Sequence, residues 1–234
     1  MILSTTPGTL PPLAPTARRP GAAAEPAAPT DPAAVTTPVL WLVRHGESTW
    51  NVLGLAQGQS DQARLTGLGV RQAWYVTDQL RGRRIGAVYA SDLRRAVATA
   101  APLAAALGLE VRCDPRLRER CLGVLEGTAS AAVPPALSGV AGDRVLDPDA
   151  RPPDGESLRA MYWRVAAFAD DLLAPSRSIR TAGEVAVVAH GGTLRLLTAY
   201  LRGVPVERMS WEPIGNGCVV RLPLHHACSG KETR

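Results

Sequence analysis

Several residue types are scarce in this 234-residue sequence, and each scarcity narrows what the chain can be. No uninterrupted apolar run approaches the roughly 20 residues that a membrane-spanning helix needs, so no membrane partner is expected. The four cysteines, Cys113, Cys121, Cys218 and Cys228, form no C-x-x-C pair and no Cys/His cluster with metal-ligand spacing. We therefore expect no metal site, and small buried cysteines of the kind found in a reducing cytoplasm.

Lysine is almost absent, because Lys231 is the single one in the chain. The net charge of +5 therefore comes from arginines, which are scattered along the sequence and not gathered in blocks. There is no basic stripe with interleaved aromatic residues, so nucleic acid is not an expected partner. The positive charge would still matter if the fold focused it on one cleft that binds an anion.

The ends of the chain differ in composition from its middle. Residues 1–36 are rich in proline and alanine without periodicity, which predicts a disordered extension. The twin arginine at Arg18 and Arg19 lacks the apolar stretch of a signal peptide, which favours a cytoplasmic location. We expect one folded domain over residues 37–224 and a flexible tail over residues 225–234.

Apolar runs alternate with helical patterns through the middle of the chain. Continuous runs at 39–43, 85–91 and 184–189, and shorter ones at 109–114 and 217–224, predict strands. Apolar residues at helical spacing predict helices over 65–80, 92–107, 155–173 and 193–201. The first of these helices should bury Val70, Ala73, Trp74, Thr77 and Leu80. Strands that alternate with helices indicate an α/β fold, with a mostly parallel central sheet covered by helices on both faces.

One segment interrupts this alternation. Residues 128–153 hold five prolines and no clear apolar stripe, so we expect a long excursion or lid there.

Three predicted strands end in residues suited to phosphate chemistry. The first runs into Arg44, His45 and Gly46, and another runs into His190, Gly191 and Gly192. A third is followed by Ser91 and, one turn into the next helix, by Arg95. Because ligands of open α/β sheets bind outside the carboxyl ends of the strands, these residues should meet at one crevice. Glycines and helix N-termini there would let a phosphate approach the backbone.

Each of these residue types has a chemical reason to be present. Arginine binds phosphate oxygens in a planar, bidentate manner and keeps its charge, and a neutral imidazole is a good nucleophile toward phosphorus. A lone histidine after a strand is more often an ordinary turn residue, and a lone arginine pair in a helix is more often solvated. The repetition at several strand ends favours a site, which would still need a proton donor for the leaving alkoxide.

Six segments in the same order resemble motifs of the histidine phosphatase superfamily, the phosphoglycerate-mutase-like group. They are "RHGESTWN", "LTGLGVRQA", "SDLRRAVATA", "LRERCLGVLEG", "PPDGES" and "VVAHGG", and the resemblance covers residues 39–222. It implies a three-layer sandwich with the fold expected above. It also implies catalysis without a cofactor and, as is common in the family, a homodimer.

The resemblance assigns roles to individual positions. His45 would become a phosphohistidine, with Arg44, Arg95 and His190 completing the phosphate pocket. Asn51, Gln57 and Gly58 align with substrate contacts of the family. Glu119 aligns with the acid that protonates the leaving group and later activates water, while Glu126 and Glu156 compete for that role. Arg94 would be solvated or paired with Asp92.

The mutase branch, as the resemblance implies, carries a lysine after the "EG" pair and an arginine pair before the "PPDGES" loop, which together clamp the carboxylate of the substrate. This chain offers only Arg144 and Arg151, separated among prolines. We therefore expect a metal-independent phosphatase for small phosphorylated metabolites, such as sugar phosphates or phosphoglycerate-type esters. The alternatives are a cofactor-dependent phosphoglycerate mutase, a phosphatase acting on phosphoproteins, and a non-catalytic module that binds phosphorylated ligands.

Overall fold

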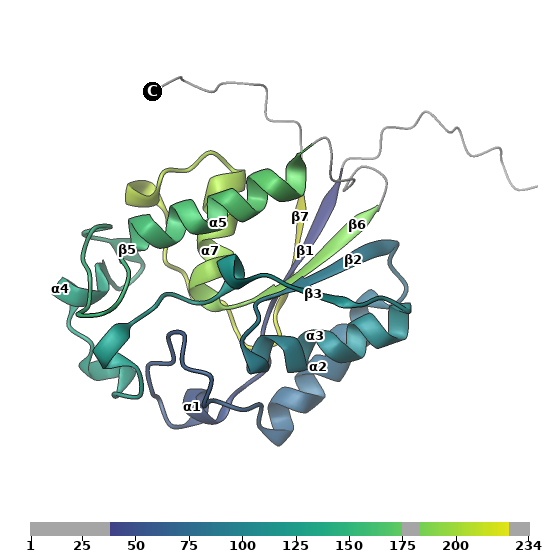
Figure 1. Cartoon of the computed structure of the whole chain (residues 1–234), viewed down its shortest axis with the longest axis horizontal. Coiled ribbons are helices and arrows are strands. Elements are labelled where there is room, and N and C mark those ends of the chain that lie inside the picture. The colour runs from purple at the N-terminus through teal and green to yellow at the C-terminus, as the bar shows by residue number, and fades with distance from the viewer. Residues whose placement is uncertain (1–37, 175–182, 225–234) are drawn as a thin grey trace, which may run out of the picture. The chain divides into compact units, whose positions relative to one another are not determined.

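A five-stranded sheet in the order β3-β2-β6-β1-β7 forms the centre of the protein (Figure 1). The computed structural model describes residues 38–174 and 183–224. The expected disordered extension (1–36) and flexible tail (225–234) therefore lie outside the described residues. β1 pairs in parallel with β6, β6 with β2 and β2 with β3, whereas β7 is antiparallel to β1. The mostly parallel sheet predicted from the sequence is thus confirmed.

The strands are β1 (Val39–Arg44), β2 (Ile85–Ala90), β3 (Val111–Cys113), β4 (Val140–Ala141), β5 (Arg144–Val145), β6 (Glu184–Ala189) and β7 (Val219–Pro223). The α-helices are α1 (Thr49–Val52), α2 (Gly67–Leu80), α3 (Arg94–Leu107), α4 (Pro135–Ser138), α5 (Leu158–Leu173) and α7 (Gly191–Leu201). Single 3-10 turns are η1 (Pro115–Leu117), η2 (Gly123–Leu125), η3 (Ser130–Ala132) and η4 (Val206–Arg208).

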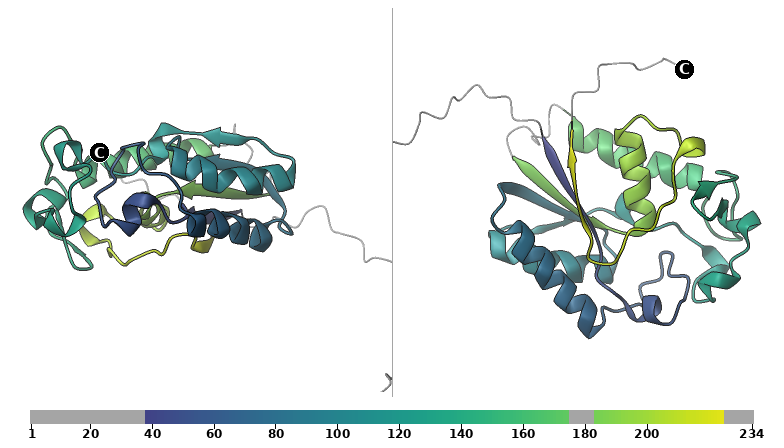
Figure 2. Two further views of the ribbon diagram at one scale, coloured as in Figure 1. Left: turned by 90° about the horizontal axis from the view of Figure 1, so that it is seen from below. Right: turned by 180° about the vertical axis from the view of Figure 1, so that it is seen from behind.

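Both faces of the sheet are buried under helices, which explains the continuous apolar runs in the sequence. In β1 the side chains alternate between the two faces. Val39, Trp41 and Val43 join one core cluster with residues of α2 and α3, whereas Leu40 and Leu42 join a second cluster with α5 and α7. Figure 1 and the rotated views of Figure 2 show the two helix pairs on opposite sides of the sheet. The predicted three-layer sandwich is confirmed.

The prediction for the buried face of α2 is confirmed for Ala73, Thr77 and Leu80 and wrong for Val70 and Trp74. Trp74 is 57% exposed and Val70 46% exposed, while Gly69 and Val76 are buried instead. The reason is a close backbone contact, because a Cβ built on Gly69 would lie 2.0 Å from the carbonyl oxygen of Glu47. Only a glycine permits this approach, and its position fixes which side of α2 faces the sheet.

The predicted burial of the cysteines is wrong for the three that the structure describes. Cys113 is exposed, because it lies in the short edge strand β3, and Cys121 and Cys218 are only partly buried. The remaining one, Cys228, lies outside the described residues. In the described part of the chain, no helix is long and apolar enough to cross a membrane.

The strand register brings the polar strand ends to one edge of the sheet. Arg44 of β1 is level with Ala189 of β6, and Ala90 of β2 with Val188. The residues that follow these strands, His45, His190 and Ser91, therefore sit side by side. In Figure 1 the loop containing α1 and the segment with α4 and β5 extend from this end of the sheet.

The contact between Gly69 and Glu47 yields a prediction about stability. Gly69→Ala should lower the free energy of unfolding by about 1–3 kcal/mol, because the added methyl group collides with main chain that cannot rotate away. Gly67→Ala is the matched control in the same helical turn, since its Cβ would have only Arg71 Nη1 as a neighbour, at 3.8 Å. Urea unfolding followed by circular dichroism should separate the two variants, and equal stabilities would contradict the packing argument.

Candidate active site

A cleft of about 520 Å³ lies at the carboxyl ends of the central strands. It is lined by every residue that the sequence singled out for the site: Arg44, His45, Asn51, Gln57, Gly58, Arg95, Glu119 and His190. These residues come from the ends of β1 and β6, from α1 and the loop after it, from α3, and from the loop after η1. The sequence placed them at one site, and the structure brings all of them together.

His45 is buried and has one nitrogen committed to the main chain. Its Nδ1 lies 2.7 Å from the carbonyl oxygen of Gly46, and a carbonyl oxygen can only accept. Nδ1 therefore carries the proton, and Nε2 keeps a free lone pair. Burial, and next the charge of Arg95, lower the pKa of His45 to about 3, so the imidazole is neutral at physiological pH.

His190 lies beside His45, with the two ring centroids 5.1 Å apart. Its Nε2 is 2.9 Å from Oγ of Ser91, which already accepts a hydrogen bond from the amide of Leu93. We assign the hydroxyl hydrogen of Ser91 to the bond with Nε2, which leaves the ring proton of His190 on Nδ1. Burial, followed by the charge of Arg95, lowers the pKa of His190 well below its ordinary value.

Main-chain carbonyl groups hold Arg44 and Arg95 in the cleft. Arg95 donates from Nη1 to Ser60 O and from Nη2 to Gly58 O, both at 2.8 Å. Arg44 donates from Nη1 to Ile214 O. Among the described residues no carboxylate forms an ion pair with either guanidinium. Burial lowers the pKa of Arg95 to about 10, so Arg95 is still charged near neutral pH.

Three buried side-chain atoms have no hydrogen-bond partner in the part of the chain that the structure describes. They are Arg44 Nε, Arg95 Nε and His190 Nδ1, and their side chains all line this cleft. Buried donors in folded proteins are nearly always satisfied, so such a group of donors is unusual. Two guanidinium groups and an imidazole N–H match the oxygens of a phosphate group.

Two amide side chains extend this set of donors. Oδ1 of Asn51 accepts from the amide of Ser48 and from Nδ2 of Asn216, and Oε1 of Gln57 accepts from the hydroxyl of Ser48. Because the oxygens are engaged, both amide groups keep their nitrogen for a ligand. Asn51 also caps α1 in a reciprocal pair with Ser48, which fixes its side chain at the rim of the cleft.

Glu119 is the one candidate acid that lines the cleft. Its Oε2 accepts from the amide of Gly192 at the start of α7, and its Oε1 accepts from the amide of Arg120, both at 2.9 Å. The competing carboxylates are occupied elsewhere. Glu126 accepts from the amides of Gln59 and Leu122, and Glu156 is paired with Arg164.

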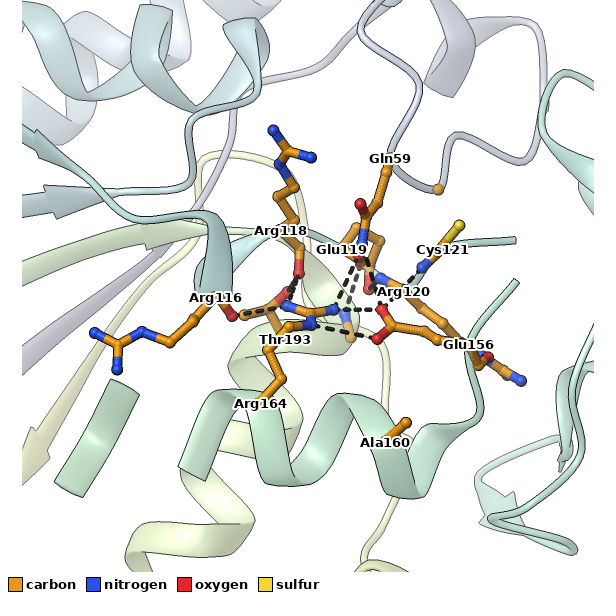
Figure 3. Close-up of polar contacts among 12 residues, drawn as sticks. Gln59, Arg116, Arg118, Glu119, Arg120, Cys121, Glu156, Ala160, Arg164 and Thr193 are labelled. Carbon is orange, nitrogen blue, oxygen red and sulfur yellow. Dashed lines mark hydrogen bonds and ion pairs between the residues drawn. The ribbon is translucent and has the colours of Figure 1, made fainter. Parts of the chain in front are cut away.

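Arg164 and Glu156 hold the main chain on both sides of Glu119 (Figure 3). From α5, the Arg164 guanidinium donates to the carbonyl groups of Arg116, Arg118 and Glu119. Glu156 accepts from the guanidinium of Arg164 and from the amide of Cys121. The segment that carries Glu119 is therefore fixed from behind by a half-buried ion pair that does not line the cleft.

The expected excursion over residues 128–153 forms one wall of the cleft, with Ser130, Val133, Ser138, Val140 and Gly142 among the lining residues. Arg120 anchors this wall, since its guanidinium donates to the carbonyl groups of Leu137, Ser138 and Ala150. Arg144 and Arg151, the remaining candidates for a carboxylate clamp, do not line the cleft.

The prediction for Arg94 is partly corrected. Its side chain is exposed, as expected, but its partner is Asp61 at 2.8 Å and not Asp92. Asp92 instead accepts two hydrogen bonds from the guanidinium of Arg118, which hold the pKa of Asp92 below its ordinary value.

Sequence reasoning gave no role to Arg195, Trp211 and Asn216. Arg195 lies one turn into the helix after His190, just as Arg95 lies one turn into the helix after Ser91, and this repetition could have indicated it. Trp211 and Asn216 belong to the irregular segment before β7, which carries no periodic signal. Pairing of β7 with β1 brings that segment back to the site, where Trp211 lines the cleft and Asn216 donates from Nδ2 to Asn51 Oδ1.

Comparison with known proteins agrees with this geometry. The family model of the histidine phosphatase superfamily (branch 1) matches residues 40–230. A probable phosphoglycerate mutase of Yersinia enterocolitica is 36% identical over 174 residues, covering 71% of this chain and 75% of that relative. A related protein of Yersinia pestis with the same name is 37% identical over 176 residues, covering 72% and 76%.

Solved structures resemble the fold as well. A mycobacterial glucosyl-3-phosphoglycerate phosphatase in complex with VO3 superposes with a TM-score of 0.67 at 32% identity, covering 78% of this chain and 91% of that one. A structure described as mycobacterial hydrolase 1 gives a TM-score of 0.64 at 31% identity, covering 78% and 90%. The chain therefore belongs to the histidine phosphatase superfamily, and by this family and these structural neighbours it is a phosphatase enzyme.

The neutral, buried histidines predict how stability depends on pH. The unfolded chain binds protons at His45 and His190 below a pKa of about 6.5, whereas the folded chain does not until far lower pH. The contribution of these two histidines to the free energy of unfolding is therefore complete above about pH 6.5. It is lost as the pH falls toward 3, with a slope on the order of 1 kcal/mol per pH unit for each group. Urea unfolding between pH 7.5 and 4.5 should show a smaller acid loss for the double variant His45→Gln/His190→Gln than for the wild type, and equal losses would contradict the argument.

The Arg164 network predicts an effect on acid catalysis. Arg164→Met leaves Glu156 unpaired and should lower the free energy of unfolding by about 3 kcal/mol. It should also slow hydrolysis of alkyl phosphates more than that of p-nitrophenyl phosphate, because p-nitrophenolate leaves without much help from an acid. Glu119→Gln should show the same bias between substrates.

Arg159→Met is the matched control, because Arg159 is another ion-paired arginine of α5 that binds Asp149 and Glu207 at the surface. Arg159→Met should change little in the free energy of unfolding or in the ratio of the rates on alkyl phosphates and p-nitrophenyl phosphate. An equal slowing of both substrates by Arg164→Met would mean that Arg164 supports the fold without positioning Glu119.

Proposed function

We propose that this protein is a metal-independent phosphatase that hydrolyses small phosphorylated metabolites through a covalent phosphohistidine at His45. The observation that carries the proposal is the set of unpartnered buried nitrogens of Arg44, Arg95 and His190 around the free Nε2 of a neutral His45. A phosphoryl group that accepts from these donors would present its phosphorus to that lone pair. Phosphoryl transfer depends mainly on such positioning and on charge stabilisation.

In the first step, Nε2 of His45 attacks phosphorus and the bond to the ester oxygen breaks. The electron pair of that bond stays with the leaving oxygen, which takes the proton from the carboxyl group of Glu119. The hydrogen bond from Nδ1 to the carbonyl group of Gly46 keeps the ring aimed and supports the positive charge that it gains. Arg44, Arg95 and His190 Nδ1 stabilise the negative charge on the equatorial oxygens.

In the second step, the carboxylate of Glu119 takes a proton from a water molecule, whose oxygen attacks the phosphorus of the phosphohistidine. The N–P bond breaks, its electron pair returns to Nε2, and inorganic phosphate leaves. Glu119 is thereby protonated again for the next ester. The two amide groups that hold its oxygens, from Arg120 and Gly192, keep the carboxyl group in place for both roles.

Small metabolites are the favoured substrates because their size suits a cleft of about 520 Å³ that residues 128–153 wall on one side. Esters of sugars and of phosphoglycerate-type acids fit this description. The metal-independent character rests on the arginine and histidine donors, which supply the positive charge that a metal ion would otherwise provide. Among the described residues, no group of three or more His, Cys, Asp or Glu side chains is arranged to hold a metal ion.

A phosphoglycerate mutase is the second candidate, and the names of the curated relatives favour it. The cleft favours hydrolysis, because neither Arg144 nor Arg151 reaches it and the chain has no lysine at the expected position. A mutase must keep its phosphoenzyme away from water, and a cleft without the clamp does so less well.

The first test is the release of phosphate from p-nitrophenyl phosphate in the presence of EDTA. The wild type should be active, and His45→Asn should lose at least about 1,000-fold in rate. Wild type incubated with a radiolabelled phosphate ester and denatured in alkali should carry a labelled phosphohistidine, which acid then releases. Arg95→Ala should lose about 100-fold or more, whereas the neighbouring Arg94→Ala should stay close to wild type because Arg94 lies outside the cleft.

Other outcomes identify the alternatives. Activity that survives in His45→Asn would overturn the proposed nucleophile. Isomer exchange of phosphoglycerates that outpaces phosphate release would identify a mutase, and faster release from phosphopeptides than from metabolites a protein phosphatase. Binding of phosphate esters without turnover would identify a binding module.

A further inference from the structure

His45 and His190 lie side by side in the cleft, yet the proposed reaction uses them in opposite ways. Their ring centroids are 5.1 Å apart, and because burial lowers the pKa of both, neither ring is charged at neutral pH. His45 has to offer a lone pair to phosphorus, whereas His190 has to offer an N–H to a phosphate oxygen. A neutral imidazole has one of each, so both roles depend on which ring nitrogen carries the proton.

The two rings have different kinds of hydrogen-bond partner. Nδ1 of His45 faces the carbonyl oxygen of Gly46, which can only accept, so Nδ1 is protonated and Nε2 is left for attack. The partner of His190 is the hydroxyl of Ser91, 2.9 Å from Nε2, and a hydroxyl can donate or accept. The tautomer of His190 therefore depends on what else the hydroxyl of Ser91 contacts.

The hydroxyl of Ser91 has one other partner among the described residues. Its oxygen lies 3.3 Å from the amide nitrogen of Leu93, and an amide nitrogen can only donate. One lone pair of the hydroxyl oxygen is therefore occupied. Ser91 is fully buried, so its hydrogen needs an acceptor inside the protein, and Nε2 of His190 is the acceptor that the described chain provides.

The two tautomers of His190 leave this hydroxyl in different states. With the ring proton on Nε2, the oxygen of Ser91 would accept from both Leu93 and His190, and its own hydrogen would stay buried without an acceptor. With the ring proton on Nδ1, Ser91 accepts from Leu93 and donates to His190, so each of these groups is satisfied. Because a buried unpaired hydroxyl is unfavourable, this contact favours the tautomer with Nδ1 protonated.

The rest of the site does not favour that tautomer while the cleft is free of ligand. Nδ1 of His190 has no partner in the described chain, whichever nitrogen carries the proton. The positive charges of Arg95 and Arg44 act on the ring, and they favour a lone pair over an N–H on the side that faces the cleft. Ser91 is thus the group that opposes the two arginines.

We propose that Ser91 is a positioning residue that holds His190 as the Nδ1–H tautomer, and so makes His190 a donor to phosphate and not a second nucleophile. This inference rests on the proposed function and deepens it, because it states what distinguishes two neighbouring histidines of one pocket. The sheet puts Ser91 in place for this role. Ser91 directly follows β2, and its amide donates to the carbonyl oxygen of Val188 in β6, at 3.0 Å.

The first test measures the tautomer directly. Long-range proton–nitrogen NMR correlation on the ligand-free protein with isotope-labelled histidine distinguishes a protonated ring nitrogen from one with a lone pair. The chain has four histidines, so the spectra of His45→Asn and His190→Asn identify the two signals of the site. Wild type should show Nδ1 protonated in both rings. Ser91→Ala should move the ring proton of His190 toward Nε2 and leave His45 unchanged.

The second test determines whether Ser91 acts through His190. Ser91→Ala should lower kcat/KM for p-nitrophenyl phosphate about tenfold, the loss expected when one hydrogen bond to the phosphate is weakened. In a His190→Asn background the same substitution should change kcat/KM by less than about twofold, because the ring on which Ser91 acts is absent.

Thr77→Val is the matched control. It removes another buried hydroxyl, which donates to the carbonyl oxygen of Ala73 at 3.0 Å and does not line the cleft. Thr77→Val should leave both the tautomer of His190 and kcat/KM as in the wild type.

The outcomes separate this inference from the function on which it rests. A wild-type His190 protonated at Nε2, or a Ser91→Ala variant that keeps Nδ1 protonated, overturns the inference. Equal losses from Ser91→Ala in both backgrounds also overturn it, because Ser91 would then act on α3 and Arg95. In each of these cases turnover by the wild type and its loss in His45→Asn still support the phosphatase. No turnover of any phosphate ester overturns the proposed function, and the inference with it.

Discussion

The parallel pairing of β1 with β6 is the constraint on which the rest of the site depends. It aligns Arg44 with Ala189, so the two strands end level and release His45 and His190 at the same edge. Pairing of β2 with β6 adds Ser91 to the same row, and the helices that follow β2 and β6 bring Arg95 and Arg195 to the cleft. A shift of one residue in the register of any of these strands would turn its side chains to the opposite face of the sheet. The histidines and arginines of the site would then no longer lie together.

The protein holds this cluster together with main-chain carbonyl groups and not with carboxylates. Arg95 and Arg44 are anchored by carbonyl oxygens, which orient a guanidinium without cancelling its charge. The same arrangement holds Arg120 and Arg195. The cost is a set of buried positive groups with unsatisfied donors, which is tolerated because a bound phosphate would satisfy them and because the surrounding sheet is stable enough to bear it.

Glu119, the proposed acid, is positioned by a separate set of hydrogen bonds. Glu119 receives two main-chain amides at its carboxyl group, while Arg164 and Glu156 fix the chain behind it. This division explains why only one of the three candidate carboxylates lines the cleft. Glu126 and Glu156 have the same side chain as Glu119 and lie in neighbouring motifs. Their carboxylates accept hydrogen bonds from main-chain amides, so they hold the loops around the site in place.

Local signals were enough to predict the layer architecture, because hydrophobic periodicity distinguishes strands from helices. The residues at the strand ends also indicated that His45, His190 and Arg95 belong to the site. The sequence could not choose the buried face of α2, since Gly69 is set by contact with Glu47, nor foresee the exposure of Cys113 at the sheet edge. It favoured Glu119 over the competing Glu126 and Glu156 only through the family resemblance, and it passed over Arg195, Trp211 and Asn216. Those choices belong to the tertiary structure, because they depend on which distant backbone groups pair in the folded chain and which side chains are left to face the cleft.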